Sequence, residues 1–362
     1  MEKMGKQYTT LKDVARRAHT STATVSYILN GVQDRYVSDE LRQRVLTAAQ
    51  ELNYVKSALA SGLKGKSRGV IAITVPQFTN IFFSRLVLAV EQVARAQGYV
   101  VTMCNTFDDP DREREVLESL IQQRVDGIIL IPSERSTQNY ELIRRIGVPT
   151  VIAERPMLDY GYEIYDYILI DNFDLAYRST RYLIEKGHRN IAFLTWEARV
   201  VSLQERLRGY QAALQEADIP YRPEYVLQGP FSPEAGCRMT RRMLDTLPQA
   251  TAVVYGYHFY AQGGLPVLRE HGVRIPEDLS VFVIGDPDWV SLYSPPLAHM
   301  ELPAAKVGET AAQVLFERIS SATNGKTVPS TVRRMFPGTF VEGSSIKFIR
   351  PDDPDGKKEE KL

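Results

Sequence analysis

Apolar residues near the start of the chain recur at intervals of three and four positions, which predicts short amphipathic helices. The first helix covers 11–18 and has Thr10 as its N-cap, with Asp13 three residues later in a variant of the capping box. Residues 19–21 break the pattern before it resumes over 22–30. Two short helices joined by such a turn form a helix-turn-helix, whose second helix can enter the major groove of DNA. An ordinary αα-corner has the same pattern, so this segment alone leaves both interpretations open.

The helical spacing returns after Ser38 and predicts a third helix that ends near Tyr54. Gly31, directly after the second helix, is typical of a C-cap. Three helices this close together have the size of a compact DNA-binding headpiece. The positions expected to face its core are Leu11, Val14, Ala15, Ala18, Val25, Ile28, Leu29, Leu41, Val45, Leu46, Ala49 and Leu52.

From Gly69 onward, apolar runs of strand length alternate with amphipathic helical segments. Continuous apolar strands between helices are typical of a parallel sheet covered on both faces. The alternation restarts near Ile168, which predicts two similar α/β lobes with a ligand cleft at the carboxyl ends of their strands. The predicted strands are 69–75, 99–105, 127–132, 149–153, 168–170, 191–195, 225–228, 252–255 and 280–284, and the helices are 82–98, 112–124, 140–146, 175–186, 203–217, 233–247 and one ending at His271.

Two segments have a composition that opposes stable structure. Residues 57–68 are small and basic and contain Gly62 and Gly65, each of which costs about 1 kcal/mol in a helix. We predict a linker that is disordered unless something orders it. The tail over 346–362 is charged and interrupted by Pro and Gly, so it is also predicted to be disordered.

The distribution of charge singles out the N-terminal region, although the whole chain has a net charge of zero. Residues 1–68 hold twelve Lys and Arg against six Asp and Glu, a net charge of +6, which leaves −6 for the remainder. A basic headpiece on an acidic body fits phosphate binding by the headpiece alone.

Several classes of protein are disfavoured by what the chain lacks. No apolar run approaches the roughly 18 residues of a membrane span, and the polar start has no signal-peptide core, so we expect a cytoplasmic protein with no membrane partner. Cys104 and Cys237 are isolated and favour buried thiols over a disulfide. The sequence has no phosphate-binding Gly-rich loop, metal-ligand cluster or nucleophile elbow. We expect neither catalysis nor a cofactor.

A series of short motifs along the chain resembles the lactose-repressor (LacI/GalR) family of bacterial transcription regulators. The resemblance runs from Thr10 to about Val341. The motifs, in family order, are T-L-x-D-V-A from Thr10, S-x-x-T-V-S and L-N-G between Ser21 and Gly31, E-L-N-Y at 51–54, R-V-D-G-I-I-L at 124–130, D-N at 171–172, G-H-R at 187–189, R-x-x-G-Y from Arg206, I-P-E-D-L-S-V at 275–281 and P-P-L at 295–297.

The resemblance implies an α/β chain with a helix-turn-helix headpiece, a hinge and a two-lobed core like that of periplasmic binding proteins. The expected boundaries are 1–56 for the headpiece, 57–68 for the hinge, 69–345 for the effector-binding and dimerisation core and 346–362 for the tail. Within the core, lobe 1 is expected over 69–170 and 300–328, and lobe 2 over 171–299 and 329–345.

The resemblance also implies that Thr22, Ala23 and Tyr27 contact base edges in the major groove. A Thr hydroxyl, an Ala methyl group and a Tyr hydroxyl are all suited to this, and a simple helix former is the alternative for Ala23. The positions that match contacts with the DNA backbone are Thr10, Ser21, Ser26, Asn30 and Tyr54. His19, in the turn, tolerates left-handed backbone better than a branched residue does.

The linker corresponds to the hinge helix of the family, which places Leu63, followed by Lys64, in the minor groove of the operator. The usual Ala-Arg-Ser-Leu is Ala60-Ser61-Gly62-Leu63 in this chain. One basic residue is lost and a helix-weakening glycine is gained, so folding of the hinge on DNA should be harder. A passive linker is the alternative.

In the core, the resemblance implies an effector site between the lobes. Arg206 matches the arginine that binds sugar hydroxyls or carboxylates, although a structural salt bridge is the alternative. Asp286 or Asp288 matches the acidic ligand residue. Phe82, Phe83 and Trp289 are candidate stacking walls or core residues. Tyr257-His258 replaces the usual Asn-Asp, which suggests an effector other than a standard hexose, or an altered pose, with His258 at the site.

These features together predict a transcriptional regulator, most simply a repressor, that grips a pseudo-palindromic double-stranded operator as a homodimer. Its operator affinity is expected to depend on a small effector, a carbohydrate by resemblance, which closes the lobes and changes the spacing of the headpieces. The alternative is a cytoplasmic sugar-binding or sugar-processing α/β protein. A secreted binding protein is disfavoured by the basic headpiece.

Overall fold

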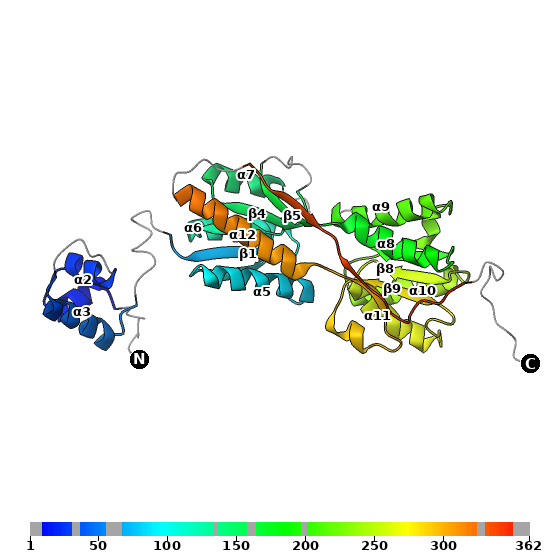
Figure 1. The fold of residues 1–362 in the computed structure, drawn as a ribbon, viewed down its shortest axis with the longest axis horizontal. Coiled ribbons are helices and arrows are strands. Elements are labelled where there is room, and N and C mark those ends of the chain that lie inside the picture. The colour runs from blue at the N-terminus through cyan, green and yellow to red at the C-terminus, as the bar shows by residue number, and fades with distance from the viewer. Residues whose placement is uncertain are drawn as a thin grey trace, which may run out of the picture. The chain divides into compact units, whose positions relative to one another are not determined.

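The computed structural model describes residues 9–30, 37–55, 67–133, 137–157, 164–196, 201–323 and 330–349. The chain forms two compact units, Met1–Arg68 and Gly69–Leu362 (Figure 1). The boundary lies where the sequence changes from a small, basic linker to strand-forming residues.

The first unit contains the three predicted helices, α1 (Leu11–Arg17), α2 (Thr22–Leu29) and α3 (Asp39–Glu51). Val14, Val25 and Val45, one from each helix, are fully buried and form the centre of its core. Leu46 is an exception to the predicted inward positions, because its side chain is 43% exposed and Ala48 takes the place on the buried face. Gly31, Leu63 and Lys64 lie outside the described residues.

The start of α1 has the predicted capping box. The Thr10 hydroxyl accepts from the backbone N–H of Asp13 at 3.4 Å, and the Asp13 carboxylate accepts from the backbone N–H of Thr10 at 2.9 Å. In the turn after α1, His19 has a φ of 50°, the left-handed conformation expected there. A side-chain capping box therefore starts the first helix, and a left-handed residue follows its end.

The described residues of the second unit form two sheets of six strands each. The first sheet has the order β2 (Val100–Asn105), β1 (Val70–Val75), β3 (Gly127–Leu130), β4 (Thr150–Glu154), β5 (Asp166–Ile170) and β11 (Arg333–Phe336). The second has the order β7 (Val226–Gln228), β6 (Ile191–Thr195), β8 (Ala252–Tyr255), β9 (Ser280–Ile284), β10 (Ala298–Glu301) and β12 (Thr339–Val341). Neighbouring strands are parallel except β10 and β12. In each sheet, the first strand in sequence (β1 or β6) lies next to the edge strand that follows it in sequence (β2 or β7). The two lobes therefore have the same topology.

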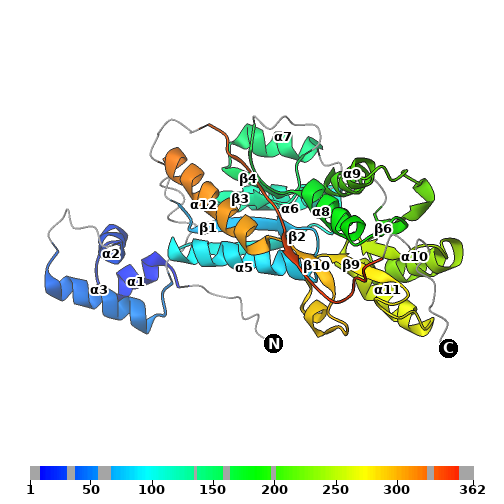
Figure 2. The same ribbon diagram turned by 45° about the vertical axis from the view of Figure 1, so that its right-hand side comes forward.

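Helices cover both faces of each sheet (Figure 1 and Figure 2). In the first lobe, α5 (Ile81–Ala96) packs with α12 (Ala304–Thr323) on one face, and α6 (Pro110–Gln122) packs with α7 (Thr137–Ile146) on the other. In the second lobe, the pairs are α8 (Asn172–Glu185) with α9 (Val201–Glu216), and α10 (Pro233–Thr246) with α11 (His258–Glu270). Strands buried on both sides explain the continuous apolar runs of the sequence.

Within the described residues, the chain passes between the lobes three times: after β5, between β10 and α12, and between β11 and β12. The last passage differs from the expected boundary at residue 329. β11 pairs in parallel with β5, with Arg333 opposite Tyr167, so residues 333–336 belong to the first lobe. β11 has only four residues, too few for the pattern of apolar positions to predict which strand it pairs with.

The C-terminal segment is ordered further than predicted. The backbone N–H of Ile349 donates to the carbonyl of Lys186 at 2.8 Å, and the Ile349 side chain is buried. The prediction of disorder from residue 346 is therefore wrong for 346–349, because apolar Ile346 and Ile349 pack on the second lobe. Residues 350–362 lie outside the described part of the chain. Within that part, no helix is both long and apolar enough to cross a membrane.

His188 attaches this C-terminal segment to the second lobe. It is fully buried, with Nδ1 2.9 Å from the Thr251 hydroxyl and Nε2 3.2 Å from the Lys347 carbonyl. Burial lowers the pKa of His188 from 6.5 to about 4. The unfolded chain therefore takes up this proton at a higher pH than the folded chain does. The stability contributed by neutral His188 is complete above pH 6.5 and is lost as the pH falls toward 4.

We therefore expect the free energy of unfolding to fall by about 2 kcal/mol between pH 7 and pH 5 on account of His188. Urea midpoints measured across this range check the expectation. In a His188→Gln variant, which retains a donor toward the Lys347 carbonyl, the pH dependence should be flatter by this amount. An identical pH profile for the variant would contradict the assignment.

Candidate functional site

Helix α2 presents a polar, accessible face. Thr22 and Ala23 are exposed and Tyr27, one helical turn further on, is half-buried. Ser21 is the N-cap, and its hydroxyl accepts from the backbone N–H of Thr24 at 3.1 Å. The three predicted base-reading residues therefore lie on the accessible side of a capped helix whose other side, with Val25 and Ile28, is buried.

The predicted backbone-contacting residues have varied surroundings. Ser26 accepts a hydrogen bond from the side-chain amide of Asn30 at 3.1 Å, so these two form one polar pair near the end of α2. The Thr10 hydroxyl is already bonded to Asp13 at 2.6 Å. Ser21 is exposed and Tyr54 is half-buried. The predicted hinge contacts Leu63 and Lys64 lie outside the described residues.

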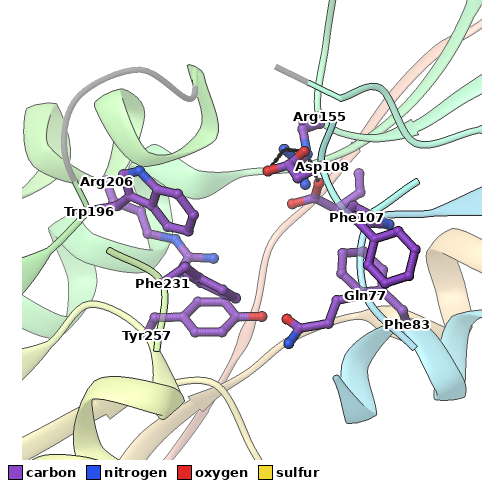
Figure 3. A pocket seen from close by; sticks show the side chains of 11 residues that line it. Gln77, Phe83, Phe107, Asp108, Arg155, Trp196, Arg206, Phe231 and Tyr257 are labelled. Atoms are coloured by element: carbon purple, nitrogen blue, oxygen red, sulfur yellow. Dashed lines mark hydrogen bonds and ion pairs between the residues drawn. The ribbon is translucent and has the colours of Figure 1, made fainter. Parts of the chain in front are cut away.

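A cavity of about 280 Å³ lies between the two lobes of the second unit. This is close to the lower end of the range of small-molecule sites, roughly 300 to 1,000 Å³. Figure 3 shows side chains of both lobes facing one another across it. The first lobe contributes Pro76, Gln77, Phe83, Phe107, Asp108, Glu154 and Arg155, and the second contributes Trp196, Arg206, Phe231 and Tyr257.

Most of the lining residues directly follow the carboxyl end of a strand. Gln77 follows β1, Asp108 follows β2 and Tyr257 follows β8. The cavity thus lies where ligands of open parallel sheets bind.

Arg206 is the cationic group of the second-lobe wall. It is 2% exposed, its Nε donates to Asn172 Oδ1 at 2.9 Å, and its Nη1 donates to the Gly256 carbonyl at 2.6 Å. Both partners are neutral, and burial lowers the pKa of Arg206 below its ordinary value. The two contacts position the guanidinium in the cavity wall, and Nη2 has no hydrogen bond to another described residue.

Arg155 is the cationic group of the first-lobe wall, and carboxylates surround it. Its Nη1 lies 3.0 Å from Asp108 Oδ1 and its Nε lies 3.0 Å from Glu154 Oε2. Burial lowers the pKa of Arg155, but the two carboxylates outweigh burial and raise it above its ordinary value. This wall therefore has two carboxylates, of Asp108 and Glu154, that can accept hydrogen bonds, and the positive charge of Arg155 balances one of them.

Aromatic rings line both walls of the cavity. Phe231 lies between Trp196 and Tyr257, with centroid distances of 4.9 Å and 4.2 Å. The Arg206 guanidinium lies 5.5 Å from the centroid of the Tyr257 ring. Phe83 and Phe107 belong to the opposite wall. Rings beside charged groups can bind the flat face of a sugar or a heteroaromatic base while polar groups bind its edge.

Three lining residues have left-handed backbone conformations without being glycine. The φ angles are 56° at Phe107, 58° at Asp108 and 69° at Glu154. Such conformations are uncommon outside glycine and concentrate at functional sites. Their position here supports a binding role for the cavity.

Two of the seven predicted effector residues, Phe83 and Arg206, line the cavity. Phe82 packs into the first-lobe core with its ring 5.2 Å from that of Phe83. Trp289 packs against the second-lobe core. His258 is 3% exposed beneath Tyr257, and burial, with Arg206 and Arg85 nearby, lowers its pKa to about 3. None of these three residues lines the cavity.

Asp286 and Asp288 lie outside the lining as well. Both carboxylates form ion pairs with Arg85, on α5 of the first lobe. The turn after β9 directs them toward this helix rather than into the cavity. The lining residues that the sequence interpretation did not include are Pro76, Gln77, Phe107, Asp108, Glu154, Arg155, Trp196 and Phe231, and Tyr257 was noted only as part of the Tyr257-His258 replacement. The carboxyl ends of the predicted strands were the available signal for most of them.

Comparison with known proteins agrees with both units. Residues 10–57 match the family described as bacterial regulatory proteins, lacI family, and residues 180–346 match a periplasmic binding protein-like domain. The chain is 34% identical over 314 residues to the HTH-type transcriptional repressor PurR of Mannheimia succiniciproducens, covering 86% of this chain and 92% of that protein.

Solved structures with a similar fold include transcriptional regulator CelR in complex with cellobiose. It has 28% identity and a TM-score of 0.71, and the match covers 93% of this chain and 99% of that one. The lac repressor dimer bound to operator and the anti-inducer ONPF has 25% identity and a TM-score of 0.78, over 94% of this chain and 100% of that one.

Proposed function

The chain belongs to the LacI family of bacterial regulatory proteins, and we propose that it is a repressor whose operator binding is controlled by a small molecule in the interlobe cavity. The observation that carries this proposal is a cavity lined by both lobes, with Arg206 held in its wall by Asn172. The same chain has the accessible, N-capped helix α2 in its first unit. A ligand that contacts both lobes favours one interlobe arrangement over another by its difference in affinity.

The effector we propose is a carbohydrate of about one or two sugar rings. The aromatic rings can stack on its apolar face, and Arg206, Asp108 and Glu154 offer donors and acceptors for its hydroxyls. The similar structure of CelR was determined with cellobiose. A nucleobase or nucleoside is the second candidate, because the same rings can stack on a planar heterocycle.

A thermal-shift screen of the core, residues 69–349, tests the effector class with monosaccharides, disaccharides, nucleosides and small acids. A ligand present at 100 times its Kd should stabilise the core by about 2.7 kcal/mol. A hit among the sugars supports the proposal, and hits confined to nucleosides would replace it by the second candidate. Incubation of each hit with the protein, followed by product analysis, separates a regulator from a sugar-processing enzyme, which would show turnover.

We also propose that the protein acts as a homodimer on a pseudo-palindromic operator in the cytoplasm. The first sheet ends in the edge strand β2, where Val100 is 65% exposed and Met103 is 43% exposed, and Leu88 on the neighbouring α5 is 57% exposed. An apolar edge of this kind is a liability unless another chain covers it. The similar lac repressor structure is described as a dimer bound to operator.

Replacing Tyr27 by Ala tests base readout by α2. We expect the affinity for a specific operator to fall by up to about 10-fold, because a single hydrogen bond contributes about 0.5 to 1.5 kcal/mol. The affinity for unrelated DNA should change little, because phosphate contacts dominate it. Titrations at fixed salt, with both DNAs, measure the two affinities and the number of chains per operator. Equal losses on both DNAs would remove Tyr27 from base readout.

A further inference from the structure

The start of α5 reaches from the first lobe to the second. Asn80 is the N-cap of this helix, and its Oδ1 accepts from the backbone N–H of Phe82 at 3.0 Å. Its Nδ2 donates to the Tyr257 hydroxyl at 2.5 Å, and Asn80 is fully buried. Because Tyr257 follows β8, this buried hydrogen bond joins the two lobes.

Arg85, on the same helix, makes a second connection between the lobes. Its Nη1 donates to the carboxylate of Asp286 and, at 3.1 Å, to the Asp286 backbone carbonyl. Its Nη2 lies 2.8 Å from Asp288 Oδ1. Asp286 Oδ1 in turn accepts from the backbone N–H of Leu302 at 3.0 Å, in the passage from β10 to α12. Arg85 therefore holds a loop that is itself attached to an interlobe passage.

Tyr257 belongs to this contact and to the cavity at the same time. Its ring lines the cavity, lies 4.2 Å from the Phe231 ring and packs under the Arg206 guanidinium. Its hydroxyl bonds Asn80 of the other lobe. Displacement of this side chain by a ligand would leave a fully buried amide without its acceptor, which is costly.

We infer that Asn80, Arg85, Tyr257, Asp286 and Asp288 form an interlobe clasp, and that Tyr257 makes the strength of this clasp depend on what occupies the cavity. The inference rests on the proposed function only in naming the cavity as the effector site. Tyr257 is a positioning residue in this scheme. A ligand that moves the Tyr257 ring changes the Asn80 bond and so biases one lobe arrangement.

The members of the clasp should contribute unequally. The Asp286 side chain is 18% exposed and that of Asp288 is 79% exposed, so water screens the second ion pair far more than the first. Asp286→Asn, which keeps the acceptor for Leu302, should therefore loosen the clasp more than Asp288→Asn does. Arg85→Lys should retain part of the contact that Arg85→Gln removes.

Distances between spin labels on the two lobes test the clasp in the full-length protein. Cys104 and Cys237 are replaced by Ala, labels are attached to Cys introduced at Glu118 on α6 and at Arg242 on α10, and labelled chains are diluted with unlabelled ones. Both labelled positions are exposed. The starting protein should give one dominant distance, and Tyr257→Phe, Arg85→Gln and Asp286→Asn should each add a second population.

Tyr255→Phe is the matched control. It also removes a buried hydroxyl from the second lobe, but that hydroxyl bonds Thr240 of the same lobe at 3.1 Å. Its distance distribution should match that of the starting protein. Unchanged distributions in all three clasp variants, or an equal change in Tyr255→Phe, would overturn the inference.

Operator titrations of the same variants separate the clasp from the proposed function. Tyr257→Phe and Arg85→Gln should shift the operator Kd in the same direction by about fivefold or more, and Tyr255→Phe should leave it within about twofold. If the starting protein binds no operator, the proposed function fails while the distance measurement still decides the clasp. Opposite shifts in Tyr257→Phe and Arg85→Gln would contradict a single clasp.

Discussion

Replacing Arg206 by Ala should abolish the effector response and leave operator binding intact. The guanidinium is held by Asn172 and Gly256, so its remaining donors would meet a ligand in the cavity already oriented. A hydrogen bond to a charged group contributes about 1.5 to 3 kcal/mol, so the loss of one or two such bonds should weaken effector binding by about 100-fold. Calorimetry with a hit from the ligand screen measures the affinity, and operator titration with and without that ligand measures the response.

Arg208→Ala is the control for this variant. Arg208 lies on the same helix and pairs with Glu205 near the surface, with a side chain that is 65% exposed. Its removal tests whether any change in α9 disturbs the core, and the effector response should persist. An Arg206→Ala protein that still responds to the ligand would place the effector site elsewhere.

Replacing Arg318 by Met should lower the free energy of unfolding by about 3 kcal/mol, the usual cost of breaking a buried ion pair from one side. Arg318, on α12, pairs with Asp166 through Nε at 2.7 Å and Nη2 at 2.6 Å, and both side chains are buried. Asp166 also accepts from the backbone N–H of Val332 at 2.8 Å. The variant would leave the buried Asp166 carboxylate without its cationic partner. This carboxylate connects α12, β5 and the segment before β11.

Urea unfolding of the full chain, followed by far-UV circular dichroism, measures this loss. Arg95→Met is the matched control, because Arg95 pairs with Glu91 on the surface of α5 at 3.7 Å with a side chain that is 74% exposed. Its free energy of unfolding should change by no more than about 0.5 kcal/mol. Comparable losses in the two variants would show that the buried pair has no special contribution.

Local signals predicted the headpiece and most core elements. The capping residues Thr10 and Asp13, the break around His19 and the apolar spacing act within a few residues of one another, so the helices they define can be read directly. Leu46 is the exception, because spacing alone does not distinguish it from its neighbours. The change at Gly69 from a small, basic segment to alternating apolar strands and amphipathic helices likewise marks the boundary between the units.

The position of the cavity between the lobes was predicted correctly, but only some of its lining residues were. The rule that ligands bind at the carboxyl ends of parallel strands placed it between the lobes. Resemblance to the family identified Arg206 and Phe83. It also suggested Asp286 and Asp288, which the structure pairs with Arg85 instead. The direction of a side chain after a strand depends on the path of the turn, and that path depends on contacts with distant segments.

The amino-acid sequence by itself determined that a basic helix-turn-helix precedes an α/β core with two repeated lobes, because helix caps, apolar periodicity and charge are properties of neighbouring residues. Only the tertiary structure decided that β11 joins the first lobe, that residues 346–349 pack on the second, and that Tyr257 meets Asn80 across the cavity. Each of these contacts brings together residues more than 150 positions apart in the chain. Such pairs leave no local pattern, because their energy arises only once both lobes have folded.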